Sequence, residues 1–291
     1  MFISSTHIDD AFPSTWLLTR HTRKAAGGTI QSRYNKIWNT GLKHCHPHPC
    51  IQPQWSTNKE AHPYIMLPLR DPIDRFHSSF YWRVLRVCHP DPEQQITNYK
   101  ELQGRDWECE KGGNGNGYEG QAIHVTYQQN ASKLALDLCS ADPALEQAAR
   151  KTISLLGHAQ HNVRDWMAFD WQPERVYTIV VEKGFASIED QTDEALRWIW
   201  NNTHFEDPSD FHRRSEYAYQ HGPKIAQTPN GAHSSAALKE PLTPAAIHCL
   251  RSFYKEEYDF FSELSQKTCK NVRCEAAIEN ILIRRSWTGA N

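Results

Sequence analysis

Two short stretches of the sequence carry residue types suited to binding a phosphorylated anion. The first, Lys24-Ala25-Ala26-Gly27-Gly28-Thr29, offers a lysine charge, a hydroxyl and small residues. The backbone N–H groups of such residues can face an anion at the start of a helix. The second pairs Arg70 with Ser78, and an arginine fork with a hydroxyl makes a good phosphate clamp. The triphosphate-binding loop G-x-x-x-x-G-K-[ST] is absent, which disfavours a triphosphatase.

Each stretch also has a plainer interpretation. The glycines of the first suit an ordinary tight turn between a strand and a helix, and Arg70 could form a surface salt bridge with Asp74. On the expected helix, Ser78 points away from the apolar face formed by Ile73, Phe76 and Phe80, so it is not one of the residues that pack on that face. The two stretches taken together therefore favour the anion site.

Both stretches lie between an expected strand and an expected helix. Residues 16–19 and 64–69 have strand character, and helical spacing follows at 30–38 and from Pro72, with Asp71 as the expected N-cap. A further strand is expected at 176–181. Further helices are expected from Leu145, from Ser187 and from Thr243. Strands that alternate with helices predict an α/β fold built from parallel βαβ units.

Composition excludes several classes of protein. The chain has 291 residues, 39% hydrophobic and 23% charged, and a net charge of -2, so it is neither disordered nor a membrane bundle and shows no overall basic signal for nucleic acid. Its apolar runs are too short to span a bilayer, so no transmembrane segment is expected. We predict a single domain over residues 1–291, with a glycine-rich flexible insertion near 104–122. No acidic residue lies between Asp10 and Glu60, so the first anion-binding stretch sits in a basic segment.

The eight cysteines permit disulfides without requiring them. Because the first residues show no signal-peptide pattern, we interpret the thiols as reduced and the protein as cytoplasmic, or as resident in the Golgi lumen if the chain is trimmed from a longer one. Asn130-Ala131-Ser132 and Asn201-Asn202-Thr203 are formal glycosylation sequons. The segment Cys45-His46-Pro47-His48-Pro49-Cys50 packs four zinc-ligand types together, but structural zinc sites usually use two separated ligand pairs, so no metal is predicted.

The two anion-binding stretches together resemble the sulfotransferases that use 3′-phosphoadenosine 5′-phosphosulfate (PAPS), in particular the carbohydrate-type branch. Residues 24–29 look like the 5′-phosphosulfate loop of that family, and residues 69–78 look like its 3′-phosphate motif, followed by the aromatic residues Tyr81 and Trp82. Arg23 stands where the family usually has proline. The resemblance implies a three-layer α/β sandwich with a central, mainly parallel sheet, the P-loop-like sulfotransferase fold. It also implies transfer of a sulfuryl group from PAPS to a hydroxyl or amine, with a glycan as the first choice of acceptor.

Residue roles follow from the same resemblance. Lys24 would be catalytic by neutralising the leaving phosphate, and no metal is required. The residues expected to bind PAPS are Arg23, Lys24, Ala26, Gly27, Gly28, Thr29, Ile30, Arg70 and Ser78. The candidates for the base are His44, His46, His48, Glu60 and His62. His46 is favoured because His44-Cys45-His46-Pro47 is the nearest counterpart of a Gly-His-x-Pro-like segment in the family, and imidazole has a suitable pKa.

Other interpretations of the sequence stay open. The acceptor could be a small-molecule metabolite or a protein tyrosine. The chain could instead be a non-catalytic module on the same fold, or a zinc-dependent interaction protein centred on residues 45–50. The oligomeric state is not indicated by the sequence.

Overall fold

The computed structural model of the chain describes residues 17–20, 42–45, 64–87, 89–91, 93, 118–156, 159, 163–167, 171–181, 187–202 and 239–286. The chain divides into two compact units, each assembled from separated stretches. The sheet unit draws on Met1–Asp71, Val163–Ala226 and Asp259–Arg284. The helical unit draws on Pro72–Asn162, Gln227–Tyr258 and Arg285–Asn291. This division leaves the single-domain prediction as a prediction, because the chain passes between the units several times.

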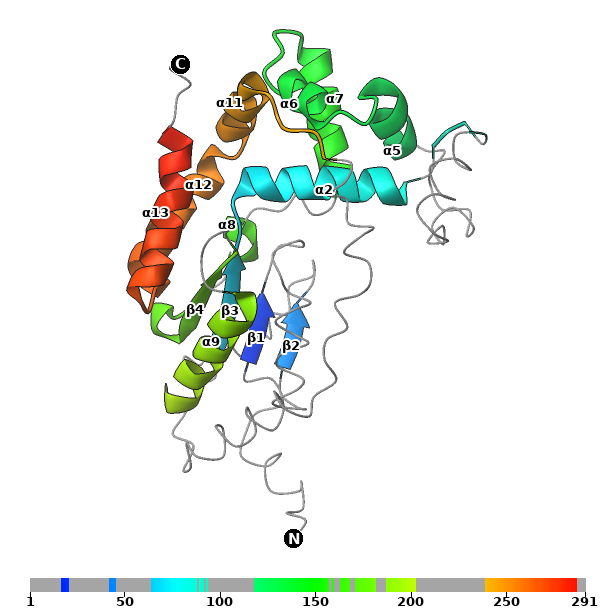
Figure 1. Cartoon of the computed structure of the whole chain (residues 1–291). Helices are drawn as coiled ribbons and strands as arrows, with labels where there is room; N and C mark the ends of the chain where they lie inside the picture. The colour runs from blue at the N-terminus through cyan, green and yellow to red at the C-terminus, as the bar shows by residue number, and fades with distance from the viewer. Residues whose placement is uncertain are drawn as a thin grey trace. The chain divides into compact units, whose positions relative to one another are not determined.

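The sheet unit contains four parallel strands in the order β2-β1-β3-β4. These are β2 (Leu42–Cys45), β1 (Leu17–Arg20), β3 (Tyr64–Leu69) and β4 (Val176–Val180). Figure 1 shows their arrows pointing in the same direction. β4 is buried along its whole length, as is β3 after its first residue, which is typical of parallel strands covered on both faces. The prediction of a mixed α/β fold with parallel strands is confirmed.

The helices of the sheet unit are α8 (Val163–Trp166), the 3₁₀ turn η6 (Pro173–Arg175), α9 (Ile188–Asn202), α13 (Val272–Ser286) and the last part of α12 (Lys255–Thr268). The start of α9 agrees with the expected cap, because the Ser187 hydroxyl accepts a hydrogen bond from the Asp190 N–H at 3.0 Å. Consecutive residues of a strand face opposite sides of a sheet. Tyr177 of β4 contacts Trp198 of α9, and Thr178 bonds to Thr268 of α12, so helices cover both faces of β4.

The helical unit is built from α2 (Pro72–Arg86), α5 (Tyr118–Gly120), the π-helix η5 (Gln121–Thr126), α6 (Ala131–Asp137), α7 (Pro143–Leu155) and α11 (Pro244–Phe253). α2 begins at the predicted Pro72, and Phe76 and Phe80 of its expected apolar face are fully buried. Thr243 caps α11 by accepting a hydrogen bond from the Ala246 N–H at 3.2 Å.

Two details of the expected helices are wrong. The helix expected from Thr243 is interrupted at Tyr254, so that α11 and α12 are separate helices. Leu145, the first apolar residue of the helix expected from it, is 45% exposed, whereas Ala149 and Ile153, which follow at helical spacing, are buried. Leu145 lies in the first turn of α7, so the helix starts to pack against its neighbours only farther along.

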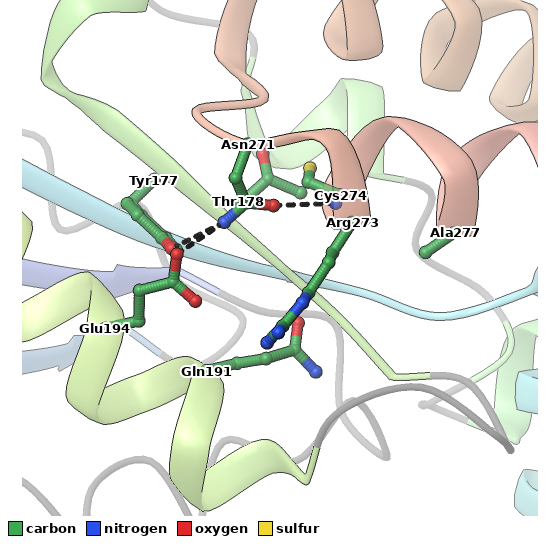
Figure 2. Close-up of a pocket in the computed structure, with 8 residues that line it drawn as sticks. All are labelled: Tyr177, Thr178, Gln191, Glu194, Asn271, Arg273, Cys274 and Ala277. Atoms are coloured by element: carbon green, nitrogen blue, oxygen red, sulfur yellow. Dashed lines mark hydrogen bonds between the residues drawn. The ribbon is translucent and has the colours of Figure 1, made fainter.

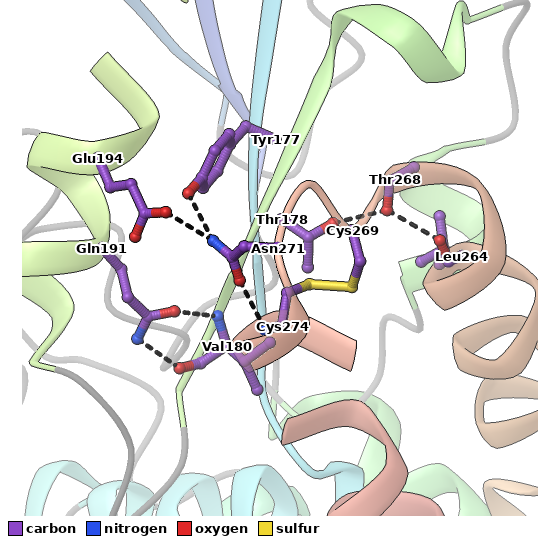
Figure 3. The surroundings of a disulfide bond; sticks show 10 residues. All are labelled: Tyr177, Thr178, Val180, Gln191, Glu194, Leu264, Thr268, Cys269, Asn271 and Cys274. Carbon is purple, nitrogen blue, oxygen red and sulfur yellow. Dashed lines mark hydrogen bonds between the residues drawn. A yellow bond between two sulfur atoms is a disulfide. The ribbon is translucent and has the colours of Figure 1, made fainter. Parts of the chain in front are cut away.

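Two disulfide bonds correct the interpretation of the cysteines. Cys139 after α6 is bonded to Cys249 in α11, and Cys269 is bonded to Cys274 at the start of α13. Figure 3 shows the second bond beside β4. The prediction that the thiols are reduced is therefore wrong for these four cysteines, and the sequence could not reveal it because Cys139 and Cys249 meet only in the folded chain. Of the helices described, none is both long enough and apolar enough to cross a membrane.

Candidate functional site

The candidate site lies where β2, β1 and β3 end. β2 lies on one side of β1 in the sheet, and β3, the next strand along the chain, lies on the other side of β1. The connections therefore diverge between β1 and β3. In open parallel sheets, ligands bind outside the carboxyl ends of the strands at such a divergence. This edge of the sheet is therefore the expected ligand site on topology alone.

The predicted binding residues follow these three strands in the sequence. Arg23 comes shortly after Arg20, the last residue of β1, His46 directly follows Cys45 at the end of β2, and Arg70 directly follows Leu69 at the end of β3. Neighbouring strands lie about 5 Å apart, so the three strand ends are within about 10 Å of one another across the sheet. Register sets how far each strand reaches: Arg20 pairs with Cys45, so β1 and β2 end level, whereas Thr19 pairs with Met66, so β3 continues about two residues, or about 7 Å, beyond them.

Two predicted phosphate ligands lie among the described residues. Arg70 is partly exposed at the end of β3, as a residue that meets a ligand at this edge must be. Ser78 lies in α2 with 8% of its surface exposed, so little of this residue is accessible to a ligand. Arg70 belongs to the sheet unit and Ser78 to the helical unit. Their pairing as a clamp stays a prediction.

The remaining predicted site residues lie mostly outside the described part of the chain. Of the five base candidates, His44 lies in β2, where it pairs in register with Thr19. The predicted binding residues and base candidates that lie outside the described residues are Arg23, Lys24, Ala26, Gly27, Gly28, Thr29, Ile30, His46, His48, Glu60 and His62. Most of the glycine-rich insertion near 104–122 also lies there. Tyr81, matched by the family motif, is only 2% exposed and packs in the helical core, whereas Trp82 is partly exposed.

A polar cluster covers the outer edge of β4 (Figure 2). The Asn271 amide donates to the Tyr177 hydroxyl at 3.1 Å and to Glu194 at 2.7 Å, while its oxygen accepts from the Cys274 N–H at 2.8 Å. Burial, together with the charge of Glu194, raises the pKa of Tyr177. Tyr177 is therefore neutral at ordinary pH, and its hydroxyl oxygen accepts from Asn271. The amide thus joins β4, α9 and α13.

Gln191 completes the cover of this edge. Its side chain accepts from the Val180 N–H and donates to the Val180 carbonyl, both at 2.9 Å, as a neighbouring strand would (Figure 3). The recess between these groups has room for about one water molecule, too little for a substrate. We interpret the cluster as a device that protects an edge strand. Sequence reasoning missed it; the only sequence signal was Asn271 as a possible N-cap of a final helix.

A buried ion pair lies in the helical unit. Arg75 of α2 makes a two-pronged contact with Glu257 of α12, with N–O distances of 2.5 and 2.6 Å, and both side chains are essentially unexposed. The Arg75 guanidinium also lies 5.6 Å from the ring centre of Tyr254. Burial alone would lower the pKa of Arg75, but the charge and hydrogen bonds of Glu257 outweigh it and leave the pKa raised. Neither side chain is accessible to a ligand, so the pair holds helices together.

A buried histidine lies in the π-helix η5. His124 Nε2 donates to the Val87 carbonyl at 2.6 Å, and its Nδ1 has no hydrogen-bond partner among the described residues. Burial lowers the pKa of His124, and the neighbouring His89 ring, centred 5.1 Å away, adds to the effect. Because His124 is buried and bonds to a backbone carbonyl at the end of α2, we interpret it as a structural residue of the helical unit.

Comparisons of the chain with family models, curated proteins and solved structures found no match.

Proposed function

We propose that the protein is a PAPS-dependent sulfotransferase that transfers a sulfuryl group to a hydroxyl or amine of an acceptor, with a glycan as the favoured acceptor class. One observation carries the proposal. The stretches that resemble the family's two nucleotide motifs, together with the favoured base, each follow one of three adjacent parallel strands that end at the same edge of the sheet. Motif matches that arose by chance would have no reason to follow strands that are neighbours in this way.

The chemistry expected at this edge is an in-line displacement. A bond forms between the acceptor oxygen and sulfur while the bond between sulfur and the bridging phosphate oxygen breaks, and its electron pair stays with 3′-phosphoadenosine 5′-phosphate. In this proposal Lys24 stabilises the charge that develops on the bridging oxygen, and His46 takes the acceptor proton. Gly27, Gly28 and Thr29 hold the 5′-phosphate. Arg70, whose guanidinium suits a phosphate, holds the 3′-phosphate with Ser78.

We extend the proposal to the fold and the compartment. Helices on both faces of β4 and the burial of β3 and β4 support a three-layer sandwich with a central parallel sheet of the P-loop-like sulfotransferase type. The two disulfide bonds support an oxidising compartment, in which such bonds persist, over the cytoplasm. The Golgi lumen is the compartment of this kind that suits a carbohydrate sulfotransferase.

Nucleotide binding tests the proposal directly. The melting temperature of the full chain is measured against increasing 3′-phosphoadenosine 5′-phosphate and, separately, 5′-AMP, which lacks the 3′-phosphate. We expect stabilisation by the first at lower concentration, because a charge-assisted contact contributes about 1.5–3 kcal/mol, or roughly 10- to 150-fold in Kd. If 5′-AMP stabilises the protein equally well, the proposal is wrong.

Two substitutions separate the proposed roles. Arg70→Ala should weaken binding of 3′-phosphoadenosine 5′-phosphate but hardly change binding of 5′-AMP, whereas Lys24→Ala should abolish sulfuryl transfer and largely spare nucleotide affinity. Arg197→Ala removes an exposed arginine of α9 and serves as the matched control. Equal losses of affinity in Arg70→Ala and Lys24→Ala would contradict these roles. A wild-type protein that binds the nucleotide but transfers nothing to any acceptor in a screen with labelled PAPS would be the non-catalytic module.

A further inference from the structure

The last turn of α9 presents an asparagine to solvent. The inner face of this helix is formed by the buried residues Ala195, Leu196 and Ile199. Asn201 lies four residues after Arg197, which puts both on one side of the helix, and both are exposed. The helix end itself is anchored, because the Tyr64 hydroxyl donates to the Asn202 carbonyl at 2.9 Å. Asn201 is thus an exposed side chain on a fixed backbone.

Asn201 begins the sequon Asn201-Asn202-Thr203, in which the middle residue is not proline. The disulfides Cys139–Cys249 and Cys269–Cys274 point to folding in an oxidising compartment, where glycan-transferring enzymes also act. Sequon, exposure and disulfide bonds are three separate observations that agree. We propose that Asn201 carries an N-linked glycan. The inference rests on the compartment proposed above and not on sulfotransferase activity.

The modification needs an oligosaccharide donor linked to a lipid pyrophosphate. The Asn201 side-chain nitrogen forms a bond to the first sugar carbon and loses one proton. The bond between that carbon and the pyrophosphate oxygen breaks, and its electron pair leaves with the lipid pyrophosphate. No oxidant or reductant takes part.

The second sequon is a poorer site. The Asn130 side chain accepts from the Lys133 N–H at 3.0 Å as the N-cap of α6, and its amide donates to Glu240 at 3.4 Å. The Ser132 hydroxyl, which completes this sequon, is buried and accepts from the Thr243 N–H at 3.0 Å. Both side chains serve the fold of the helical unit, so we assign the glycan to Asn201.

A glycan at Asn201 leaves the candidate site open. The bond from Tyr64 to Asn202 places the end of α9 beside the first residue of β3. The candidate site lies at the other end of β3, where Arg70 follows Leu69. At about 3.3 Å per residue, the six residues of β3 separate the two ends by about 17 Å. Loss of the glycan should therefore leave transfer and nucleotide binding unchanged.

The test uses the full chain directed into the secretory pathway of eukaryotic cells. The secreted protein is treated with an amidase that releases N-glycans and converts the modified asparagine to aspartate, and its mass and its tryptic peptides are measured. We expect loss of glycan mass and conversion at position 201 in the wild type. Asn202→Gln, which keeps the sequon, should behave identically, and Asn201→Gln should carry no glycan at this position. Thr203→Ala removes the sequon without altering Asn201 and replaces Asn201→Gln if that variant is not secreted.

Each outcome decides the proposal. Amidase-sensitive mass that is lost in Asn201→Gln or Thr203→Ala and kept in Asn202→Gln supports it. A wild type that has no amidase-sensitive mass, or a mass that persists in Asn201→Gln and disappears in Asn130→Gln, overturns it. Nucleotide titration of the same samples keeps the two proposals apart, because a glycosylated protein that does not bind 3′-phosphoadenosine 5′-phosphate would reject only the sulfotransferase.

Discussion

Removing one partner of the buried ion pair between Arg75 and Glu257 should destabilise the protein strongly. In an effective dielectric of about 20, unit charges about 4 Å apart attract each other by about 4 kcal/mol. In Glu257→Leu this attraction and two hydrogen bonds are lost, while the cost of burying the arginine charge remains. We expect a loss of about 3–5 kcal/mol in the free energy of unfolding. Arg75→Met should cost a similar amount.

The double variant distinguishes burial of an unpaired charge from loss of packing. Arg75→Met combined with Glu257→Leu replaces both charges with apolar groups, so no charge is left without its partner, and we expect a stability within about 1.5 kcal/mol of the wild type. Urea unfolding at 25 °C, followed by tryptophan fluorescence, gives the three free energies. Arg150→Ala, which breaks an exposed pair with Glu146, is the control and should cost less than about 1 kcal/mol.

Two results would refute this reasoning. If the double variant loses as much as the two single variants together, the side chains contribute independently and the ion pair is not the source of the effect. If either single variant loses less than about 1 kcal/mol, water or a local rearrangement compensates the charge, and the two side chains are less buried in solution than in the structure.

Three further predictions concern pH, covalent structure and a helix cap. Because burial lowers the pKa of His124, the unfolded chain takes up this proton at a higher pH than the folded chain. The free energy of unfolding should therefore fall as the pH drops below about 6.5, by up to about 1.4 kcal/mol per pH unit. In urea unfolding from pH 7.5 to 5, this dependence of the free energy on pH should be shallower for His124→Gln. Replacing Cys139 and Cys249 together by alanine should cost about 5 kcal/mol, since the bond joins residues 110 positions apart in the sequence, and a melting temperature of this variant equal to that of the oxidised wild type would contradict it. Ser187→Ala should cost about 1 kcal/mol in the same urea assay, and Ser187→Asp should restore most of it.

Local signals explain which parts of the fold could be predicted from the sequence. β3, β4 and the start of α2 agree with the predictions because a run of apolar residues, or a proline after a capping residue, determines these elements largely by itself. β2 was not predicted. Its four residues mix leucine with lysine, histidine and cysteine, and they form a strand through pairing with β1.

Features that depend on tertiary contacts could not be predicted. The break between α11 and α12 occurs without glycine or proline, next to the contact of Tyr254 with the buried Arg75. The partner of Cys139 lies in a helix far along the chain. For the candidate site, the sequence indicated the residues that follow β1 and β3, but only the strand order shows that these strands are neighbours.

The bond between Cys139 and Cys249 also determines what a protease can release. It closes a covalent ring that includes β4 and the whole of α9. One peptide-bond cleavage at any point within this ring opens it but frees no fragment. Only reduction of the disulfide, or a second cleavage, separates the pieces, so a nicked molecule stays covalently continuous and differs in mass from the intact chain only by the water added in hydrolysis.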